Sequence, residues 1–369
     1  MVINLSLVLN DVAKFITSKI EVSEINETNY ISTENMISNK GGITIATSLP
    51  DTKSVRKYLP KDILINNIRP YFKKIWYSDR EGGCSNDVFV IRSNENYDSK
   101  FLYYVLSSDD FFSYVMATAK GTKMPRGDKK AIQNYEVPNF SLDEQKRISF
   151  ILGEIDKKIE VNERINKNLT KLSSVIFINL MKKSNNFLEL NECCKFIKGK
   201  KPKETSDYPQ SNFLDYLTID VLSNQSQMYA YDEKGILVNE YDILMVMDGA
   251  SSGKLFYGKS GLVGSTLAKL NVEEKYREIV FQFLKQSEKF ISDNTTGSAI
   301  PHTDKGLVLS LKCPISEELL NYSDTFKSIR SSIITNNNEI LKLQKLRDTL
   351  LPKLMSGEID VSKINCDFK

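Results

Sequence analysis

Residues that could carry out catalysis are few in this chain and do not stand at catalytic spacings. The only histidine, His302, cannot build a two-histidine metal site or a histidine-based triad. The run Gly249–Lys254 resembles a phosphate-binding loop, but it is one residue short and Leu255 follows where Ser or Thr is needed. Asp232 and Lys234 fit only the minimal end of a nuclease motif, which a highly charged chain produces often. No Pro-Pro pair is present, as an amino-methyltransferase motif would require. The sequence favours a binding protein over an enzyme.

Basic residues gather in two places, although 50 Lys and Arg against 47 Asp and Glu leave a net charge of only +3. Local basic surface matters more than net charge for binding phosphates. The first group has no acid within it: Lys195, Lys198, Lys200, Lys201 and Lys203. The second contains only Asp128: Lys120, Lys123, Arg126, Lys129 and Lys130. Composition alone leaves the partner open.

Length and composition indicate a folded protein of several domains. The 369 residues suggest two or three domains, and a hydrophobic fraction of 41% supports a core in each. The N-terminus has no basic run before an apolar stretch, and no stretch is long enough to cross a bilayer. The cysteines are odd in number and lack metal-ligand spacing: Cys84, Cys193, Cys194, Cys313 and Cys366. We therefore expect reduced thiols, a cytoplasmic location, no metal and no membrane contact.

The chain repeats itself, which is the strongest signal in the sequence. Short segments recur in the same order at offsets that drift between 174 and 186 residues. The paired starting positions are Leu9 and Leu190, Tyr30 and Tyr216, Asp62 and Asp242, Gly121 and Gly297, Pro138 and Pro314, and Leu172 and Leu346. Loop insertions and deletions would produce such a drift, so the sequence predicts a duplicated unit.

Each repeat begins with a mixed globular part. Runs rich in β-branched residues and bounded by Gly, Pro, Asn and Ser predict strands at 42–46, 62–65, 87–91, 242–246 and 307–311. Apolar residues at helical spacing predict one helix per repeat, at 100–119 and 274–292. This pattern is typical of an α+β domain.

Each repeat ends with a long helix. Ser141 and Glu144 form a capping-box pattern that predicts the first helix start, and the second starts near Ser316. Apolar residues alternate spacings of four and three from Ile148 to Leu180 and from Ile329 to Leu354, which is the seam of a coiled coil. Polar interruptions at the equivalent positions Asn162 and Asn336 could fix the register. The alternative is two amphipathic helices, each packed only on its own domain.

We prefer an α+β fold with two globular domains separated by two long helices. The helices would form an antiparallel coiled coil and give the molecule an approximate two-fold repeat. The predicted parts are a first domain at 1–140, a central helix at 141–185, a second domain at 186–315, a distal helix at 316–358 and a tail at 359–369.

Three segments carry a resemblance to a known family, that of type I restriction–modification specificity subunits. The central run from Tyr135 to Leu172 resembles the family's central region, and 346–361 resembles its distal region. The run Asp62–Tyr71 resembles a common stretch of its target-recognition domains. The resemblance covers nearly the whole chain, but the second helix lacks the Glu-Gln-rich start seen at Glu144 and Gln145.

The resemblance implies a non-catalytic, DNA-binding subunit with two target-recognition domains. Each would read one half of a bipartite, asymmetric site in double-stranded DNA, and the helices would set the spacer between the halves. Two modification subunits with S-adenosylmethionine would methylate adenine, and restriction subunits with ATP and Mg would cut DNA in phage defence. No cofactor is expected in this chain.

Polar loop residues are the candidates for DNA contact, because anchoring to phosphates and reading of base edges need Arg, Lys, Asn and Ser side chains. In the first domain these are Asn66, Asn67, Arg69, Lys73, Lys120, Lys123 and Arg126. In the second they are Asp248, Ser251, Ser252, Lys254, Ser298 and His302. Three rival hypotheses stay open: a specificity subunit whose methylation and cleavage partner is one polypeptide, a coiled-coil scaffold for proteins, and a nuclease using Asp232 and Lys234.

Overall fold

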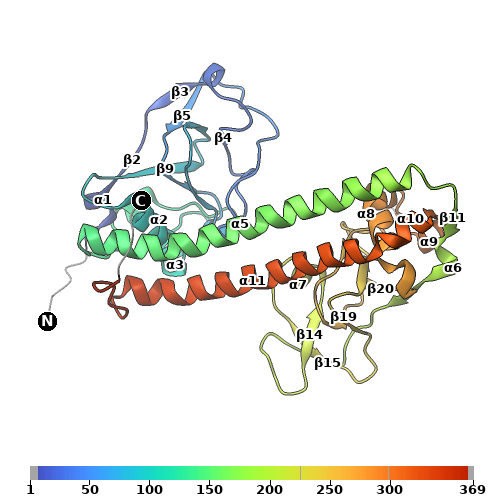
Figure 1. Cartoon of the computed structure of the whole chain (residues 1–369). Helices are drawn as coiled ribbons and strands as arrows, with labels where there is room; N and C mark the ends of the chain where they lie inside the picture. The colour runs from blue at the N-terminus through green and yellow to red at the C-terminus, as the bar shows by residue number, and fades with distance from the viewer. Residues whose placement is uncertain (1–6, 225, 298, 365–369) are drawn as a thin grey trace. The chain divides into compact units, whose positions relative to one another are not determined.

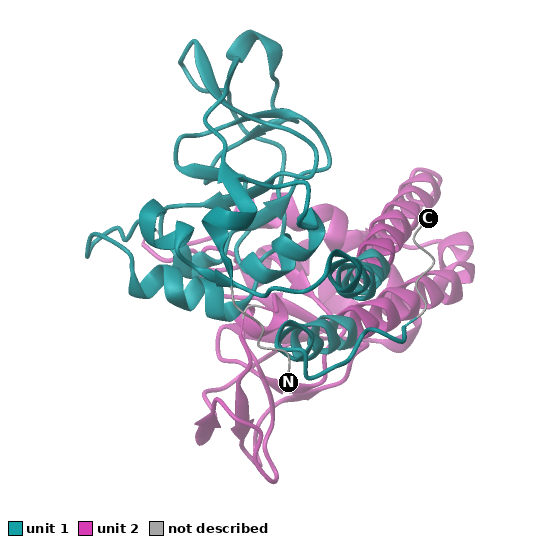
Figure 2. Cartoon of the chain, turned by 90° about the vertical axis from the view of Figure 1, so that its left-hand side faces the viewer, with its two compact units in different colours: residues 1–159, 341–369 teal, residues 160–340 magenta. Residues whose placement is uncertain are grey.

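The structure, a computed structural model, describes residues 7–224, 226–297 and 299–364. Two compact units divide the chain: unit 1 comprises Met1–Ile159 and Leu341–Lys369, and unit 2 comprises residues 160–340 (Figure 2). Each unit contains a globular part, called head 1 (residues 7–141) or head 2 (residues 182–322). Each also contains one half of helix α5, Leu142–Met181, and one half of helix α11, Ser323–Met355 (Figure 1).

Head 1 contains two four-stranded sheets and a short ladder. The first sheet has the order β2 (Ala13–Phe15), β9 (Val88–Ser93), β6 (Ile63–Asn66), β7 (Ile75–Tyr77). The second has the order β3 (Lys19–Glu21), β5 (Ser54–Tyr58), β8 (Gly82–Cys84), β4 (Tyr30–Ile31). The ladder joins β1 (Leu7–Val8) to β10 (Glu136–Val137). The helices are α1 (Leu9–Val12), α2 (Ser99–Leu106), α3 (Asp109–Ala117) and α4 (Lys129–Gln133), with 3-10 turns η1 (Val22–Glu24) and η2 (Pro70–Phe72).

Head 2 repeats the first sheet and the short ladder of head 1, but its second sheet has a fifth strand and a different strand order. Its first sheet has the order β12 (Cys194–Lys198), β20 (Leu267–Val272), β17 (Ile243–Val246), β18 (Leu255–Phe256). The second has the order β13 (Glu204–Ser206), β15 (Tyr229–Tyr231), β14 (Leu214–Leu217), β19 (Gly261–Val263), β16 (Leu237–Val238). The ladder joins β11 (Phe187–Glu189) to β21 (Lys312–Pro314). The helices are α6 (Leu190–Cys193), α7 (Ile219–Leu222), η3 (Glu274–Tyr276), α8 (Arg277–Asp293), α9 (Lys305–Ser310) and α10 (Glu317–Asn321).

The predicted duplication is confirmed down to single hydrogen bonds. Tyr30 pairs in parallel with β8, and its repeat partner Tyr216 pairs in parallel with β19. The repeated aspartates cap the turn before the central strand: the carboxylate of Asp62 accepts from Leu59 N–H (2.7 Å), and that of Asp242 accepts from Asn239 N–H (2.9 Å). The sequence anchors therefore mark positions where the backbone needs a particular partner.

The parallel strand pairs also require glycine at the start of β8 and β19. A Cβ on Gly82 would lie 2.1 Å from the carbonyl oxygen of Asn29, and one on Gly261 would lie 2.2 Å from that of Asp215. We expect Gly82→Ala to lower the free energy of unfolding of unit 1 by about 1–3 kcal/mol, because the backbones must separate. Urea unfolding followed by the fluorescence of Trp76, the only tryptophan, measures it.

Gly153→Ala is the matched control for that measurement. Gly153 lies inside α5, and a Cβ there would meet only the Tyr104 hydroxyl at 3.9 Å. We expect this variant to be more stable by about 0.5–1 kcal/mol, because alanine favours the helix. Equal effects of the two substitutions would contradict the close approach at Gly82.

The long helices begin and pair as the seam pattern predicted. The capping box is confirmed: the backbone N–H groups of Ser141 and Glu144 bond each other's side chains at 2.9 and 3.3 Å. Every seam position is buried or half-buried, from Ile148 to Leu180 and from Ile329 to Leu354. Within unit 1 the helices contribute Ile148, Leu152, Leu351 and Leu354 to the core around head 1. Within unit 2 they contribute Phe177, Leu180 and Phe326.

The seam asparagines lie in a polar layer of unit 2. Asn162 donates to Glu339 at 2.8 Å, and Asn336 donates to Asn166 at 2.8 Å. As residue numbers rise along α5, the residue numbers of their partners on α11 fall, so the two segments are antiparallel in this unit. In unit 1 the same holds, because Arg147 bonds the backbone of Val361 and Asp156 pairs with Arg347. The alternative of two unpaired helices is wrong within each unit.

Some predicted elements are wrong. Most of the run 307–311 lies in helix α9, which ends at Ser310, and does not form a strand, because Asp304 caps the helix through Leu307 N–H at 3.0 Å. The run 42–46 forms only an isolated bridge between Ile43 and Met36. The helix predicted at 100–119 is broken after Leu106, where Ser108 caps α3. The distal helix starts at Ser323, after the separate short helix α10.

Candidate nucleic-acid interface

In unit 1, two loops that are distant in sequence are joined by their backbones. The loop that follows β6 is called the strand-end loop (residues 67–69), and residues 120–126 form a hairpin. Within the hairpin, Lys120 and Arg126 bond each other's backbones at 2.8 and 2.9 Å. The hairpin also pairs with Ile68, and Arg69 N–H donates to Pro125 O at 2.8 Å. The predicted residues of 66–69 and 120–126 are thereby brought onto one surface.

Four cations of this surface reach solvent. Arg69 is exposed and has a left-handed backbone (φ 49°), a conformation that a non-glycine residue adopts at a cost and that clusters at functional sites. Lys123 is exposed in the hairpin loop. Arg126 is exposed and pairs with Asp87 at 3.2 Å. Lys120 pairs with Asp128 at 2.5 Å. Because surface ion pairs are weak, these cations can exchange their partners for phosphates.

Two predicted side chains in unit 1 have structural partners. Asn66 is buried (4% exposed), and its amide donates to the Ile68 carbonyl at 2.6 Å. The prediction that Asn66 contacts DNA is therefore wrong, because its side chain is not accessible. Lys73 pairs with Asp109 at 2.9 Å, and Lys40 pairs with the same carboxylate at 3.0 Å. Partial burial opposes ionisation of Asp109, but the two lysines outweigh it and lower its pKa. Asn67 is half-buried, and its side-chain oxygen has no partner among the described residues.

Unit 2 repeats the arrangement bond for bond. Gly249 N–H donates to Pro301 O at 2.9 Å, as Arg69 does to Pro125. Thr296 and His302 bond each other's backbones at 2.9 and 2.7 Å, and His302 also pairs with Asp248. Gly121 and Gly297 both open their hairpins at φ 90°. Both units therefore present the same backbone arrangement with different side chains. We call this arrangement the frame: in unit 1 it is the strand-end loop with the hairpin, and in unit 2 it is Asp248 and Gly249 with the hairpin closed by Thr296 and His302.

The side chains of unit 2 carry less free positive charge. The Asp248 carboxylate bonds His302 at 2.8 Å and Lys198 at 2.9 Å. Partial burial opposes its ionisation, but these hydrogen bonds prevail and lower the pKa of Asp248. Lys254 is exposed and lies over the Phe256 ring. Ser251 is half-buried.

Ser252 is buried (3% exposed) and donates to the Gly249 carbonyl at 2.7 Å, so the prediction that it contacts DNA is wrong as well. The predicted Ser298 lies outside the described residues.

Sequence reasoning missed several members of both surfaces. Tyr71 and Phe72 are exposed beside Arg69, with ring centroids 4.7 Å apart, and their apolar character gives no sequence signal for DNA contact. Lys198 belonged to a basic run, but nothing in the sequence paired it with Asp248. Asp109 and Asp87 carry no motif at all. Only the backbone frame brings these residues to the interface.

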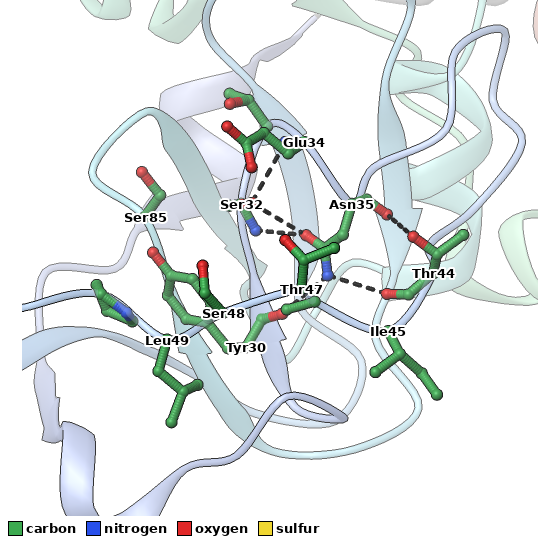
Figure 3. A pocket seen from close by; sticks show the side chains of 13 residues that line it. Tyr30, Ser32, Glu34, Asn35, Thr44, Ile45, Thr47, Ser48, Leu49 and Ser85 are labelled. Carbon is green, nitrogen blue, oxygen red and sulfur yellow. Dashed lines mark hydrogen bonds between the residues drawn. The ribbon is translucent and has the colours of Figure 1, made fainter.

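Head 1 also has a polar pocket of about 330 Å³ in its second sheet (Figure 3). Hydroxyl groups of Ser, Thr and Tyr line it together with Glu34. Its central side chain, Asn35, donates to the carbonyls of Tyr30 and Thr44 at 2.9 Å each and accepts from Ser32 N–H at 2.7 Å. The Asn35 amide is therefore occupied in holding the segment that contains β4 against the segment around Thr44.

Side chains suited to covalent or metal chemistry are not assembled in the described parts of the chain. The four described cysteines are buried, and burial raises the pKa of Cys84 and Cys194 to about 12. Among residues 7–224, 226–297 and 299–364, no three His, Cys, Asp or Glu residues are grouped to hold a metal. Within the same ranges, no helix has the length and apolar character needed to span a membrane.

Comparisons with known proteins agree with this repeat. A profile described as Type I restriction modification DNA specificity domain matches twice, at residues 8–171 and 182–343. The Type I restriction enzyme MjaVIII specificity subunit of Methanocaldococcus jannaschii is 32% identical over 46% of this chain, which spans only 41% of that protein. The MjaIX specificity subunit of the same organism is 22% identical over 72% of this chain and 70% of its own length.

A crystal structure has the same fold: that of a Type-I restriction-modification system S subunit from M. genitalium. It matches with a TM-score of 0.62 and 17% identity, over 96% of this chain and 98% of that one.

Proposed function

The chain belongs to the family of type I restriction modification DNA specificity domains, and from this we propose that it is a specificity subunit that reads a bipartite DNA site. The observation that carries the proposal is the loop-and-hairpin frame, which occurs once in each unit with the same backbone bonds. A rigid frame with exchangeable side chains is suited to reading different sequences by direct contact.

We propose that the two half-sites differ in sequence. The frame positions held by Arg69, Lys123 and Arg126 in unit 1 are held by Gly249, Ala299 and His302 in unit 2. Head 1 would therefore rely more on phosphate contacts, and head 2 more on uncharged contacts. The paired helices would set the spacer. In support, α5 is a single helix of 40 residues, roughly 60 Å long.

We propose that partner proteins carry out the methylation and the cleavage of DNA. Two modification subunits would bind S-adenosylmethionine and methylate adenine, and restriction subunits would use ATP and Mg to cut DNA. Exposed apolar residues on the long helices support docking of proteins there: Leu172 and Leu346, equivalent in the repeat, are 50% and 47% exposed.

Single substitutions in the frame test the proposal. We expect Arg69→Ala and Lys123→Ala each to weaken binding of duplex DNA by the chain co-expressed with modification subunits. Each loses one phosphate contact, so the slope of log affinity against log salt concentration should shrink by about one. Fluorescence anisotropy across a salt series measures affinity and slope together.

The matched control is Lys167→Ala, an exposed lysine on α5 that lies outside both frames. It should leave affinity and slope unchanged. Wild-type DNA binding and adenine methylation in both frame variants would contradict the proposed role of these residues. Absence of any sequence selection by the wild-type complex would instead favour a protein-binding scaffold.

A further inference from the structure

We propose that Met124 and Ile300 are base-contacting residues, each pressing an apolar side chain against the bases of one half-site. This rests on the proposed DNA-binding function. Nothing in the sequence motifs marked either residue. They are equivalent in the repeat and stand in the two hairpins of the interface, each directly before the hairpin proline.

Both side chains are exposed where a soluble loop would ordinarily hold polar residues. Met124 is 48% exposed and Ile300 is 57% exposed. A single exposed apolar residue is common on protein surfaces and indicates no function by itself. An exposed apolar residue at the same position of both copies of a duplicated loop indicates that the position has a role. The two residue types differ, so what the repeat retains is apolar character and not one side chain.

The hairpin backbone holds each side chain in a fixed position. Gly121 and Gly297 have φ 90°, and a Cβ on Gly297 would lie 2.5 Å from the Ile300 carbonyl oxygen. The prolines that follow fix the next backbone angle, and their carbonyls accept from the strand-end positions Arg69 and Gly249. A side chain on such a frame loses little entropy when it binds.

The surrounding charges favour DNA over a membrane or a protein core. In unit 1, Lys123 stands next to Met124, and Arg126 lies two residues away. In unit 2, the carboxylate of Asp248, which pairs with the hairpin residue His302, is also bound by Lys198, so two donors offset its charge. Apolar side chains on DNA-binding surfaces contact thymine methyl groups or enter between base steps.

The test uses the full chain co-expressed with modification subunits and a library of random duplexes. The duplex that the wild-type complex enriches then serves as the probe for affinity. We expect Met124→Ser to lower affinity roughly tenfold and to weaken selection in one half-site only, and Ile300→Ser to do so in the other. The salt slope should stay unchanged, because no phosphate contact is lost.

Two variants control for folding and for general surface effects. Met124→Leu keeps an apolar side chain and should retain most of the affinity. Phe187→Ser removes a comparably exposed apolar side chain (59%) from strand β11, outside both frames, and should bind as the wild type does.

Three outcomes would overturn the inference. In the first, both serine variants select and bind like the wild type, while Arg69→Ala is still impaired. In the second, the serine variants lose co-purifying partner subunits and keep full affinity per assembled complex. In the third, the wild-type complex selects no sequence, in which case the proposed function fails as well.

Discussion

Replacing Arg330 with methionine is expected to destabilise unit 2 by about 3–5 kcal/mol, the usual effect of removing one member of a buried ion pair. The Arg330 side chain is 2% exposed and that of Glu278 is 6% exposed, and the two are bonded. Arg330 also donates to the Tyr241 carbonyl at 2.9 Å and lies against the rings of Tyr257 and Phe281. Its loss would leave the Glu278 carboxylate buried without its counter-ion.

The pH dependence of this effect has a definite sign. Burial raises the pKa of Glu278 above its ordinary value, and Arg330 partly opposes the rise. A carboxyl with a raised folded pKa holds its proton more tightly when folded, so stability falls as pH climbs from the unfolded pKa to the folded one. Without Arg330 the pKa rises further. The deficit of Arg330→Met should therefore be smaller near about pH 5 than near about pH 8.

Thermal unfolding followed by circular dichroism, with hydrogen exchange of unit 2, measures the loss. The double variant Arg330→Met, Glu278→Leu is the control and should recover much of the stability, because no charge is left buried. A deficit that is equally large in the double variant, or that does not change with pH, would contradict the account of this pair.

The second large effect is expected at the helix seam. Leu152 is fully buried in the core that joins head 1 to α5 and α11, in a cluster with Leu351 and Leu354. Leu152→Ala should lower the free energy of unfolding of unit 1 by about 2–5 kcal/mol, because it removes buried apolar contacts and leaves a cavity. Urea unfolding followed by Trp76 fluorescence reports this unit.

Leu346→Ala provides the control within the same unit. Leu346 lies on α11, is 47% exposed and stands off the seam, so the free energy of unfolding of unit 1 should change by less than about 0.5 kcal/mol. Similar losses at the two positions would mean that the helix faces have been assigned incorrectly.

The sequence predicted the repeat and the helix seam because both depend on local rules. Asp62 and Gly121 recur in the second half because a capped turn and a left-handed hairpin start each demand a particular residue type. The seam needs only an apolar side chain at alternate spacings of three and four, which Ile148 and Leu152 begin. Such requirements can be read without knowing the tertiary partners.

The members of the candidate interface were predicted only in part because tertiary contacts decide which side chains are available. Asn66 and Ser252 have the right chemistry, but the fold buries both and uses their hydrogen bonds. Asp248 stays partly exposed, and its pairing with Lys198 of β12 could not be predicted from the sequence. Run 307–311 is β-prone, yet the Asp304 cap makes it a helix. In each case a distant or capping partner outweighs local propensity.

The buried contacts between heads and helices show the same limit. Arg330 in α11 corresponds to Asp156 in α5, the opposite charge at the same repeat position. In unit 1, Asp156 accepts from the Tyr104 hydroxyl at 2.6 Å and pairs with Arg347 at 2.9 Å. In unit 2, Arg330 pairs with Glu278. Each head therefore supplies a side chain that can bond the charged residue of its own helix. A single sequence does not show which side chain that is.

Mapping methylated adenines in DNA from cells that express the chain with its modification subunits tests most directly whether two unlike heads of one chain read the two halves of one DNA site. We predict two different short motifs at a fixed separation with unselected bases between them. A single uninterrupted or palindromic motif, or a methylation pattern that does not change when the chain is removed, would contradict the proposed division of the site between the heads.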